Sequence, residues 1–259
     1  MAISNAPRNP WLARSGTNPR ALLRLFCFPY AGGAASIFRT WAGNLPSTVE
    51  VCPVQLPGHG TRLLERPPTQ LEPLVKVAAE ALLPYLDKPF AFFGHSMGAI
   101  IGYELAHILV REHSLKPVHL FVTGRRAPHV TGRRAPTYNL PEAEFIAELQ
   151  RLNGTPKQVL ENPELMQLLI PIVRADFELI QTYQYESKPP LDCSISAYGG
   201  WEDQHVTRDD LDGWQQHTNA SFTLRMLLGD HFFLHSAEPL LLQLISAELL
   251  QIVSSLNER

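Results

Sequence analysis

The segment Gly94-His95-Ser96-Met97-Gly98 constrains this chain more than any other. It directly follows the apolar run 90–93 and precedes a stretch of helical character that begins at Met97 and extends to about Glu112. Glycines two positions before and two after a serine allow a strand to turn sharply into a helix and leave the hydroxyl exposed. The segment therefore predicts a strand, a tight turn and a helix, with Ser96 as a nucleophile.

Apolar runs of strand length alternate with helical stretches along most of the chain. The predicted strands are 22–28, 49–55, 90–93, 119–122, 193–198 and 222–228. The predicted helices between and after them are 36–45, 71–86, 97–112, 208–216 and 238–254. This alternation is typical of a parallel sheet with crossover helices. Together with the serine turn, it predicts one α/β domain over residues 1–259, with an α/β-hydrolase fold and a mostly parallel central sheet.

The alternation breaks after Val122. Residues 137–190 contain helical stretches at 142–152, 163–169 and 172–183 but no convincing strand. We expect this part of the chain to be a helical lid inserted within the domain.

Composition excludes several classes of protein. The 259 residues carry a formal net charge of −3, so the chain lacks the basic field of a nucleic-acid-binding protein. Three cysteines, far apart and odd in number, predict neither a disulfide framework nor a metal site. The N-terminal residues 1–20 lack the apolar stretch of a secretory signal, and no apolar run reaches membrane-spanning length. We expect a soluble, cytoplasmic monomer.

A nucleophilic serine requires a base and an acid that orients the base. In this fold they follow the serine in the order acid, then histidine, each on a loop after a later strand. His231 comes directly after the strand 222–228 and is the predicted base, ahead of His205. Two carboxylates, Glu202 and Asp203, follow the strand 193–198 and are the candidate acids.

The oxyanion formed when a serine attacks a carbonyl also needs hydrogen-bond donors. The backbone amide of Met97, at the start of the predicted helix, is one candidate because free N–H groups and the positive end of the helix dipole point toward the serine. The glycine loop Pro29-Tyr30-Ala31-Gly32-Gly33 ends an early strand. We assign the second donor to the amide of Ala31 or of a neighbour.

Four arginines are concentrated by a local repeat. Thr-Gly-Arg-Arg-Ala-Pro occurs at 123–128 and again at 131–136. It brings Arg125, Arg126, Arg133 and Arg134 into one loop region, which is either a solvated basic loop or a docking patch for an acidic partner.

Several stretches together resemble the type II thioesterases that accompany nonribosomal peptide and polyketide synthases, and more distantly the free thioesterase of animal fatty acid synthesis. They extend from about residue 22 to about residue 240 and are far more specific than the serine motif alone. The matching stretches are 28–33 (FPYAGG), 55–60 (QLPGHG), 93–98 (FGHSMG), 125–128 (RRAP), 174–178 (RADFE) and 229–232 (GDHF).

The resemblance also implies roles for individual residues. The spacing of the family's triad selects Asp203 over Glu202 as the acid. The segment 170–177 would line or cover the acyl chamber, with Ile172 and Phe177 as substrate contacts, and Asp176 would be a structural partner of Arg174 or of a nearby lid residue. His59 departs from the family's usual residue after Pro-Gly and receives no role from the sequence.

The resemblance implies a stand-alone editing enzyme. Such an enzyme hydrolyses acyl or aminoacyl thioesters from the phosphopantetheine arm of acyl- or peptidyl-carrier protein domains, and it needs no cofactor of its own. The carrier is typically acidic, so the four arginines could help it dock. Three alternatives remain open: a carboxylesterase or lipase acting on oxygen esters, an acyltransferase or cyclase with the same triad, and a non-catalytic binding protein.

Overall fold

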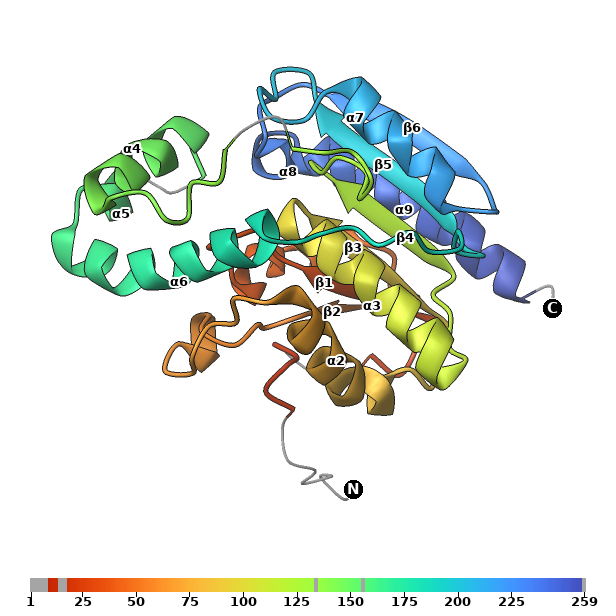
Figure 1. Ribbon diagram of the computed structural model, residues 1–259. Helices are drawn as coiled ribbons and strands as arrows, with labels where there is room; N and C mark the ends of the chain where they lie inside the picture. The colour runs from red at the N-terminus through yellow and green to blue at the C-terminus, as the bar shows by residue number, and fades with distance from the viewer. Residues whose placement is uncertain (1–8, 14–17, 133–134, 155–156, 258–259) are drawn as a thin grey trace.

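The computed structural model describes residues 9–13, 18–132, 135–154 and 157–257. Its centre is one sheet of six parallel strands in the order β2-β1-β3-β4-β5-β6 (Figure 1). The strands are β1 (Leu23–Phe28), β2 (Val49–Pro53), β3 (Phe90–His95), β4 (His119–Thr123), β5 (Ser194–Gly200) and β6 (Phe222–Leu227). Each predicted strand is present, and the α/β fold with a parallel sheet is confirmed.

Helices cover both faces of the sheet (Figure 1). Those on one face are α2 (Leu71–Leu82), α3 (Met97–His113) and α7 (Arg208–Asp212). Those on the other include α8 (Phe233–Ser236) and α9 (Glu238–Asn257). Successive side chains of a strand point to opposite faces, so a strand buried on both sides is apolar throughout. In β1, Phe26 and Phe28 pack in the core under α3, whereas Leu25 and Cys27 pack in the core under α9.

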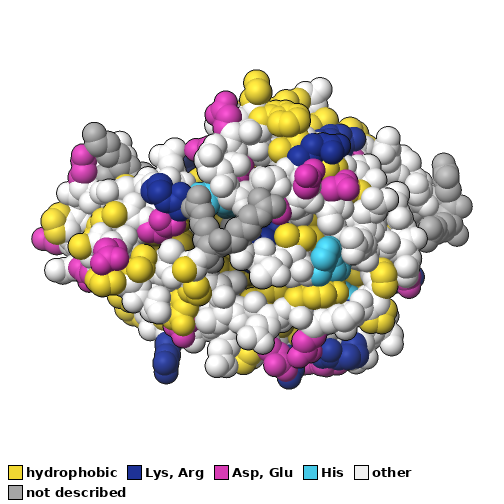
Figure 2. Space-filling view, turned by 45° about the horizontal axis from the view of Figure 1, so that its top comes forward, with side chains coloured by type: hydrophobic (Ala, Val, Ile, Leu, Met, Phe, Trp, Pro, Cys, Tyr) yellow, Lys and Arg dark blue, Asp and Glu magenta, His cyan; other side chains and the backbone are white. Residues whose placement is uncertain are grey.

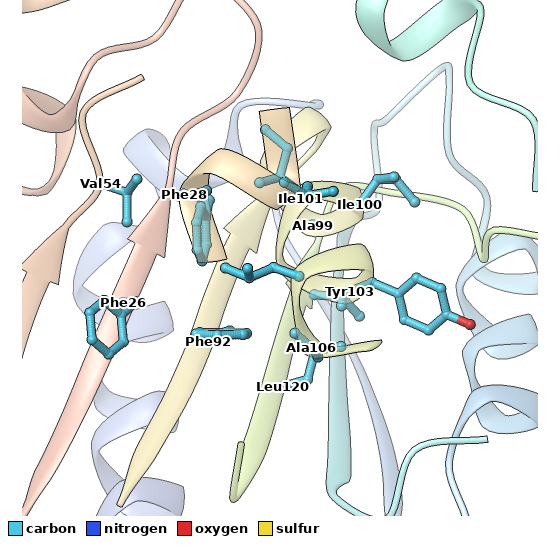
Figure 3. Packing of buried hydrophobic residues seen from close by; sticks show 14 of the residues in the cluster. Phe26, Phe28, Val54, Phe92, Ala99, Ile100, Ile101, Tyr103, Ala106 and Leu120 are labelled. Atoms are coloured by element: carbon cyan, nitrogen blue, oxygen red, sulfur yellow. The ribbon is translucent and has the colours of Figure 1, made fainter. Parts of the chain in front are cut away.

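Helix α3 is buried along most of its length and supports the sheet directly below the serine turn. Figure 3 shows its Ile101 near Phe28 of β1 and its Ala106 beside Leu120 of β4. The Phe28 and Phe92 rings meet edge to face with centroids 5.4 Å apart. This close packing holds the start of α3 against the ends of β1 and β3.

The segment between β4 and β5 contains α4 (Glu142–Leu152), α5 (Lys157–Leu160) and α6 (Pro163–Gln181). This helical insertion projects beyond the ends of the strands, to the left in Figure 1. The prediction of two helices at 163–169 and 172–183 was wrong, because α6 continues through Pro171. A proline removes one intrahelical hydrogen bond, and the packing of Ile170 and Val173 in the insertion's own core stabilises the helix despite that loss.

Three other predicted helices are divided, and one of them, 71–86, forms α2 followed by a 3₁₀ turn at Leu83–Tyr85. Residues 36–45 form a 3₁₀ turn and the four-residue helix α1 (Trp41–Asn44), and 208–216 form α7 followed by a 3₁₀ turn. The start of α7 is as predicted, since Thr207 and Asp210 form a reciprocal capping box at its N-terminus. Short helices of this kind depend on tertiary packing, so apolar spacing alone overestimates their length.

Within the described residues, α9 is long and apolar enough to span a membrane on length and composition alone, which the sequence analysis did not expect. Leu241, Ile245 and Leu249 of this helix are buried in the core below the sheet. Glu248 on the same helix accepts a hydrogen bond from the Tyr198 hydroxyl of β5 at 2.7 Å. One face of α9 therefore packs on the sheet as a core helix does, while Leu240 and Leu250 are exposed.

Charged side chains of both signs are interspersed over the face shown in Figure 2. This distribution agrees with the small net charge of the sequence.

Candidate active site

The serine turn lies between β3 and α3. Ser96 has φ 53° and ψ −111°, a conformation that costs energy for a residue with a side chain. A Cβ at Gly94 would lie 2.2 Å from the carbonyl oxygen of Gly98, and one at Gly98 would lie 2.2 Å from that of Phe28. Both glycines are therefore required for the close approach of β1, β3 and α3 that presents Ser96 at the edge of the sheet.

The structure brings Ser96, His231 and Asp203 into one hydrogen-bonded chain. The Nε2 atom of His231 is 3.0 Å from Ser96 Oγ, and its Nδ1 atom is 2.7 Å from Asp203 Oδ2. Ser96 follows β3, Asp203 follows β5 and His231 follows β6, so the carboxyl ends of three parallel strands of one sheet carry the three side chains. This geometry allows His231 to accept the Ser96 proton while Asp203 orients its ring.

The Asp203 carboxylate is held by hydrogen bonds from three residues, His231, His205 and Val206. Its other oxygen, Oδ1, accepts hydrogen bonds from the backbone N–H groups of His205 (2.7 Å) and Val206 (3.2 Å). Burial raises the pKa of Asp203, but the hydrogen bond and charge of His231, together with these amides, outweigh burial and lower the pKa below its ordinary value. Asp203 is therefore an anion that can stabilise an imidazolium.

The competing histidines have other partners. His205 stacks edge-on against the His231 ring with centroids 5.9 Å apart, and its backbone N–H donates to Asp203. His95 is fully buried, and its Nδ1 lies 2.8 Å from Thr123 Oγ1. Burial lowers the pKa of His95 well below its ordinary value, with the nearby charges of His231 and His235 adding to the effect. His95 is thus a neutral packing residue.

The backbone around the triad supplies the candidate oxyanion donors. Met97 begins α3, where N–H groups have no partner within the helix, and no bond from its amide is found among the described residues. Ala31 lies on the loop after β1 and lines one pocket with Ser96 and His231. That loop abuts the start of α3, since a Cβ at Gly98 would also come within 2.7 Å of Pro29 O.

Two pockets meet beside the triad. The pocket at Ser96, of about 160 Å³, shares Phe177 and Leu152 with an apolar chamber of about 260 Å³ beneath the helical insertion. The chamber is lined mainly by the insertion and the loop after β1, including Leu149, Val159, Met166, Leu169, Ile170 and Val173. Phe177, a substrate contact predicted from the sequence, lines both the pocket at Ser96 and the chamber.

Ile172 lies elsewhere. It is buried but lines neither of these pockets, and Ile170 and Val173 of the same helix line the chamber instead. Residues at i, i+3 and i+7 share a helix face, so the chamber-facing stripe of α6 contains 166, 170, 173 and 177 but not 172. Ile172 therefore faces away from this stripe, and its role as a substrate contact stays a prediction.

A third, more polar pocket adjoins the pocket at Ser96. It has a volume of about 570 Å³ and is lined by Arg125, Arg126, Gln181 and His205, which also line the pocket at Ser96. The Nε atom of Arg125 is buried without a hydrogen-bond partner in the described residues, and burial lowers the pKa of Arg125 to about 9. Arg133 and Arg134 lie outside the described residues.

Asp176 does not pair with Arg174. The Arg174 guanidinium instead donates to the carbonyl oxygens of Tyr138 and Leu140 and lies over the Phe145 ring. Asp176 contacts His59, to which the sequence analysis assigned no role, at 2.8 Å. No signal in the sequence joins two residues that are 117 positions apart.

Candidate metal ligands do not cluster: within the described ranges, no group of three or more His, Cys, Asp or Glu side chains could hold a metal ion. The three cysteines are free and buried.

Comparison with known proteins identifies the family. Residues 23–249 match the thioesterase domain family. The chain is 47% identical over 252 residues to a protein named linear gramicidin dehydrogenase LgrE from Brevibacillus parabrevis, with 96% of each chain covered. Among solved structures, the RedJ thioesterase from the prodiginine pathway of Streptomyces coelicolor is 40% identical, with a TM-score of 0.85 over 90% of this chain and 92% of that one.

A third relative has a more specific description. YbtT, described as a type II thioesterase from the yersiniabactin NRPS/PKS biosynthetic pathway, is 30% identical, with a TM-score of 0.75 over 94% of this chain and 95% of that one. The resemblance found in the sequence is thereby confirmed, and the chain belongs to the thioesterase family as a thioester hydrolase of the α/β-hydrolase fold.

Proposed function

We propose that this protein is a type II thioesterase that removes acyl or aminoacyl groups from the phosphopantetheine arms of carrier proteins, restoring misprimed nonribosomal peptide or polyketide synthases. The observation that carries the proposal is the hydrogen-bonded chain Ser96–His231–Asp203, at the point where an apolar chamber and a polar pocket meet. Membership of the thioesterase family and the likeness to YbtT support it.

The triad performs the reaction in two halves. His231 accepts the Ser96 proton while Oγ attacks the thioester carbonyl, and the amides of Met97 and Ala31 donate to the oxyanion. The intermediate collapses, the C–S bond breaks, the pantetheine sulfur takes the proton from His231, and the acyl group stays on Ser96. A water molecule then gives a proton to His231 and attacks the acyl-enzyme, and Ser96 recovers its proton as the acid leaves.

The two pockets suit the two halves of such a substrate. The chamber beneath the insertion is lined by aliphatic side chains and Phe177, so it favours the acyl group. The polar pocket presents Arg125 and Gln181, whose N–H groups can donate to the amide oxygens of a pantetheine arm. In this proposal the helical insertion acts as a lid over the acyl group. The carrier protein approaches on the side of the polar pocket.

The decisive test compares substrates that share one acyl group. Wild-type enzyme should release acid from acyl-carrier protein and acyl-pantetheine, with kcat/KM at least tenfold above that for the matching oxygen ester. Mass spectrometry of the carrier reports unloading. Faster hydrolysis of the oxygen ester would favour a carboxylesterase, and an acylated acceptor in place of free acid would favour an acyltransferase.

LgrE is named a dehydrogenase, so the same reactions should contain NADPH. The triad transfers protons and acyl groups, and we expect no change in nicotinamide absorbance. NADPH oxidation in step with thioester consumption would contradict the proposal.

Replacing Arg125 by methionine tests the polar pocket. Hydrogen bonds to a charged group contribute about 1.5–3 kcal/mol, so losing one to the arm should raise KM for acyl-pantetheine by about tenfold or more. KM for a p-nitrophenyl ester, which lacks the arm, should stay within twofold. The control is Arg208→Met, an exposed arginine at the start of α7. An equal rise for both substrates would show that Arg125 does not contact the arm.

The carrier-docking role of Arg125, Arg126, Arg133 and Arg134 stays a prediction, as do the monomeric state and the cytoplasmic location.

A further inference from the structure

His59 and Asp176 form a buried pair outside the triad. His59 belongs to the loop after β2 and is 3% exposed, whereas Asp176 belongs to α6 and is 1% exposed. The Nε2 atom of His59 lies 2.8 Å from Asp176 Oδ2. Burying a carboxylate without a partner has a large desolvation cost, so the contact with His59 is needed to keep Asp176 inside the protein.

The partners of His59 determine its charge. Its Nδ1 atom lies 3.0 Å from the carbonyl oxygen of Pro57, which can only accept a hydrogen bond. Its Nε2 atom faces Asp176 Oδ2, which also accepts from the Gly32 amide. Both ring nitrogens therefore donate, so the ring is an imidazolium. Burial lowers the pKa of His59, but the charge and hydrogen bond of Asp176 outweigh burial and raise it above the ordinary value.

The same carboxylate oxygen holds the loop after β1. Gly32 N donates to Asp176 Oδ2 at 2.7 Å. Gly32 has φ +79°, and a Cβ there would lie 3.1 Å from Val173 of α6, so only glycine fits this turn against the helix. One oxygen thus joins the loop after β1, the loop after β2 and the helical insertion.

The turn orients the neighbouring amide of Ala31. Gly33 N donates to the carbonyl oxygen of Tyr30 at 2.9 Å, inside the turn. Because the N–H and C=O of a trans peptide point in opposite directions, the N–H of Ala31 in that peptide points out of the turn. Ala31 lines the pocket of Ser96, where the oxyanion would form.

We propose that Asp176, held by the protonated ring of His59, is a positioning residue that fixes the turn at Gly32 and so aims the Ala31 amide at the oxyanion. This inference rests on the proposed function, in which Ala31 is an oxyanion donor. A purely structural alternative is that Asp176 only stabilises the position of α6. Arg174 separates the two possibilities, because it also stabilises α6, through the carbonyl oxygens of Tyr138 and Leu140 within the insertion, and makes no hydrogen bond with the loop after β1 among the described residues.

The test measures kcat and KM for a p-nitrophenyl ester in Asp176→Asn and Arg174→Met. Asp176 Oδ2 accepts hydrogen bonds from both Gly32 and His59. If the asparagine turns its oxygen toward them, the imidazolium of His59 is buried without a compensating negative charge. If the asparagine turns its NH₂ group toward them, that group faces the N–H donor of Gly32. Complete loss of an oxyanion donor costs about 10²–10³ in kcat. Displacement of the donor should lower kcat of Asp176→Asn by roughly 10- to 100-fold with KM within threefold, and Arg174→Met should retain kcat.

Equal losses of kcat in the two variants, or kcat within twofold of wild type in Asp176→Asn, would overturn the proposal. If Asp176→Asn does not fold, His59→Gln serves in its place. Glutamine can donate to Asp176 without a charge, so the turn at Gly32 survives in weakened form and kcat should fall several-fold with KM retained. An unchanged kcat in His59→Gln would overturn the role of His59.

Nuclear magnetic resonance tests the pair without any assay of activity. The ¹⁵N shifts of His59 in the wild-type protein at neutral pH should be those of an imidazolium, and in Asp176→Asn those of a neutral ring. A neutral His59 in the wild-type protein would overturn the assignment of charge. The p-nitrophenyl ester probes only the triad and the oxyanion site, so these ratios stay measurable even if carrier-bound thioesters prove not to be substrates.

Discussion

Replacing Ser96 by alanine should lower kcat by a factor on the order of 10⁴ to 10⁶, with the remaining activity arising from substrate binding and the oxyanion donors. The change removes the attacking Oγ, which lies 3.0 Å from His231 Nε2. Backbone contacts of the turn persist, including the bond from Ser96 N to Thr123 O at 2.8 Å. The dissociation constant for acyl-carrier protein should therefore stay within about threefold, and stopped-flow or mass-spectrometric unloading measures the loss.

The triad acts as a unit, so its losses should not add. The double variant Ser96→Ala with His231→Ala should be no slower than Ser96→Ala alone within a factor of about three. Ser255→Ala is the matched control, since this exposed serine near the end of α9 bonds only to Gln251 O within the described residues. Labelling by a fluorophosphonate should occur in wild type and in the control but not in Ser96→Ala. Turnover by Ser96→Ala at more than a tenth of the wild-type rate would exclude Ser96 as the nucleophile.

Replacing Asp203 by asparagine should lower kcat by about 10⁴-fold. The structure predicts why an isosteric change is so harmful. Oδ1 accepts from the amides of His205 and Val206, so the asparagine oxygen must take that position and its NH₂ group must face His231. His231 Nδ1 then has to accept a hydrogen bond, the ring proton moves to Nε2, and the ring cannot take the proton of Ser96.

The control for Asp203→Asn is Glu202→Gln. Glu202 is the adjacent carboxylate and the other candidate acid from the sequence, and it is exposed. Its kcat should stay within twofold of wild type, and circular dichroism should show both variants folded. A large loss in Glu202→Gln together with a small one in Asp203→Asn would exchange the two assignments.

Local sequence patterns predicted well those elements whose residue pattern is distinctive by itself. Strands buried on both faces are nearly continuous apolar runs, so β1 and β3 were found within two residues of their observed ends. The helices that the patterns misjudged depend on tertiary contacts. Helix α6 continues through Pro171 because its side chains pack in the insertion's core, and α5 is too short to show a period.

The triad could be predicted because the order of its residues along the chain follows the order of the strands that carry them. Ser96, Asp203 and His231 each come directly after a strand, and parallel strands place such positions at one edge of the sheet. Met97 follows from the same turn. Phe177 was proposed through the family resemblance. Whether Ile172 faces the chamber depends on how α6 is rotated about its axis. The short segment 170–177, which contains Pro171, does not define that rotation in the sequence.

The sequence by itself determined the fold class and the positions of the candidate nucleophile and base, because each depends on a short motif or on the order of elements along the chain. The tertiary structure decided what motifs leave open. In the structure, Arg125 lines the pocket at Ser96, and Asp176 contacts His59 and Gly32 instead of Arg174. These contacts join segments up to 144 residues apart. Contacts between residues so far apart in the sequence depend on how the elements pack and on which side chains become buried. Local sequence patterns specify neither the packing nor the burial.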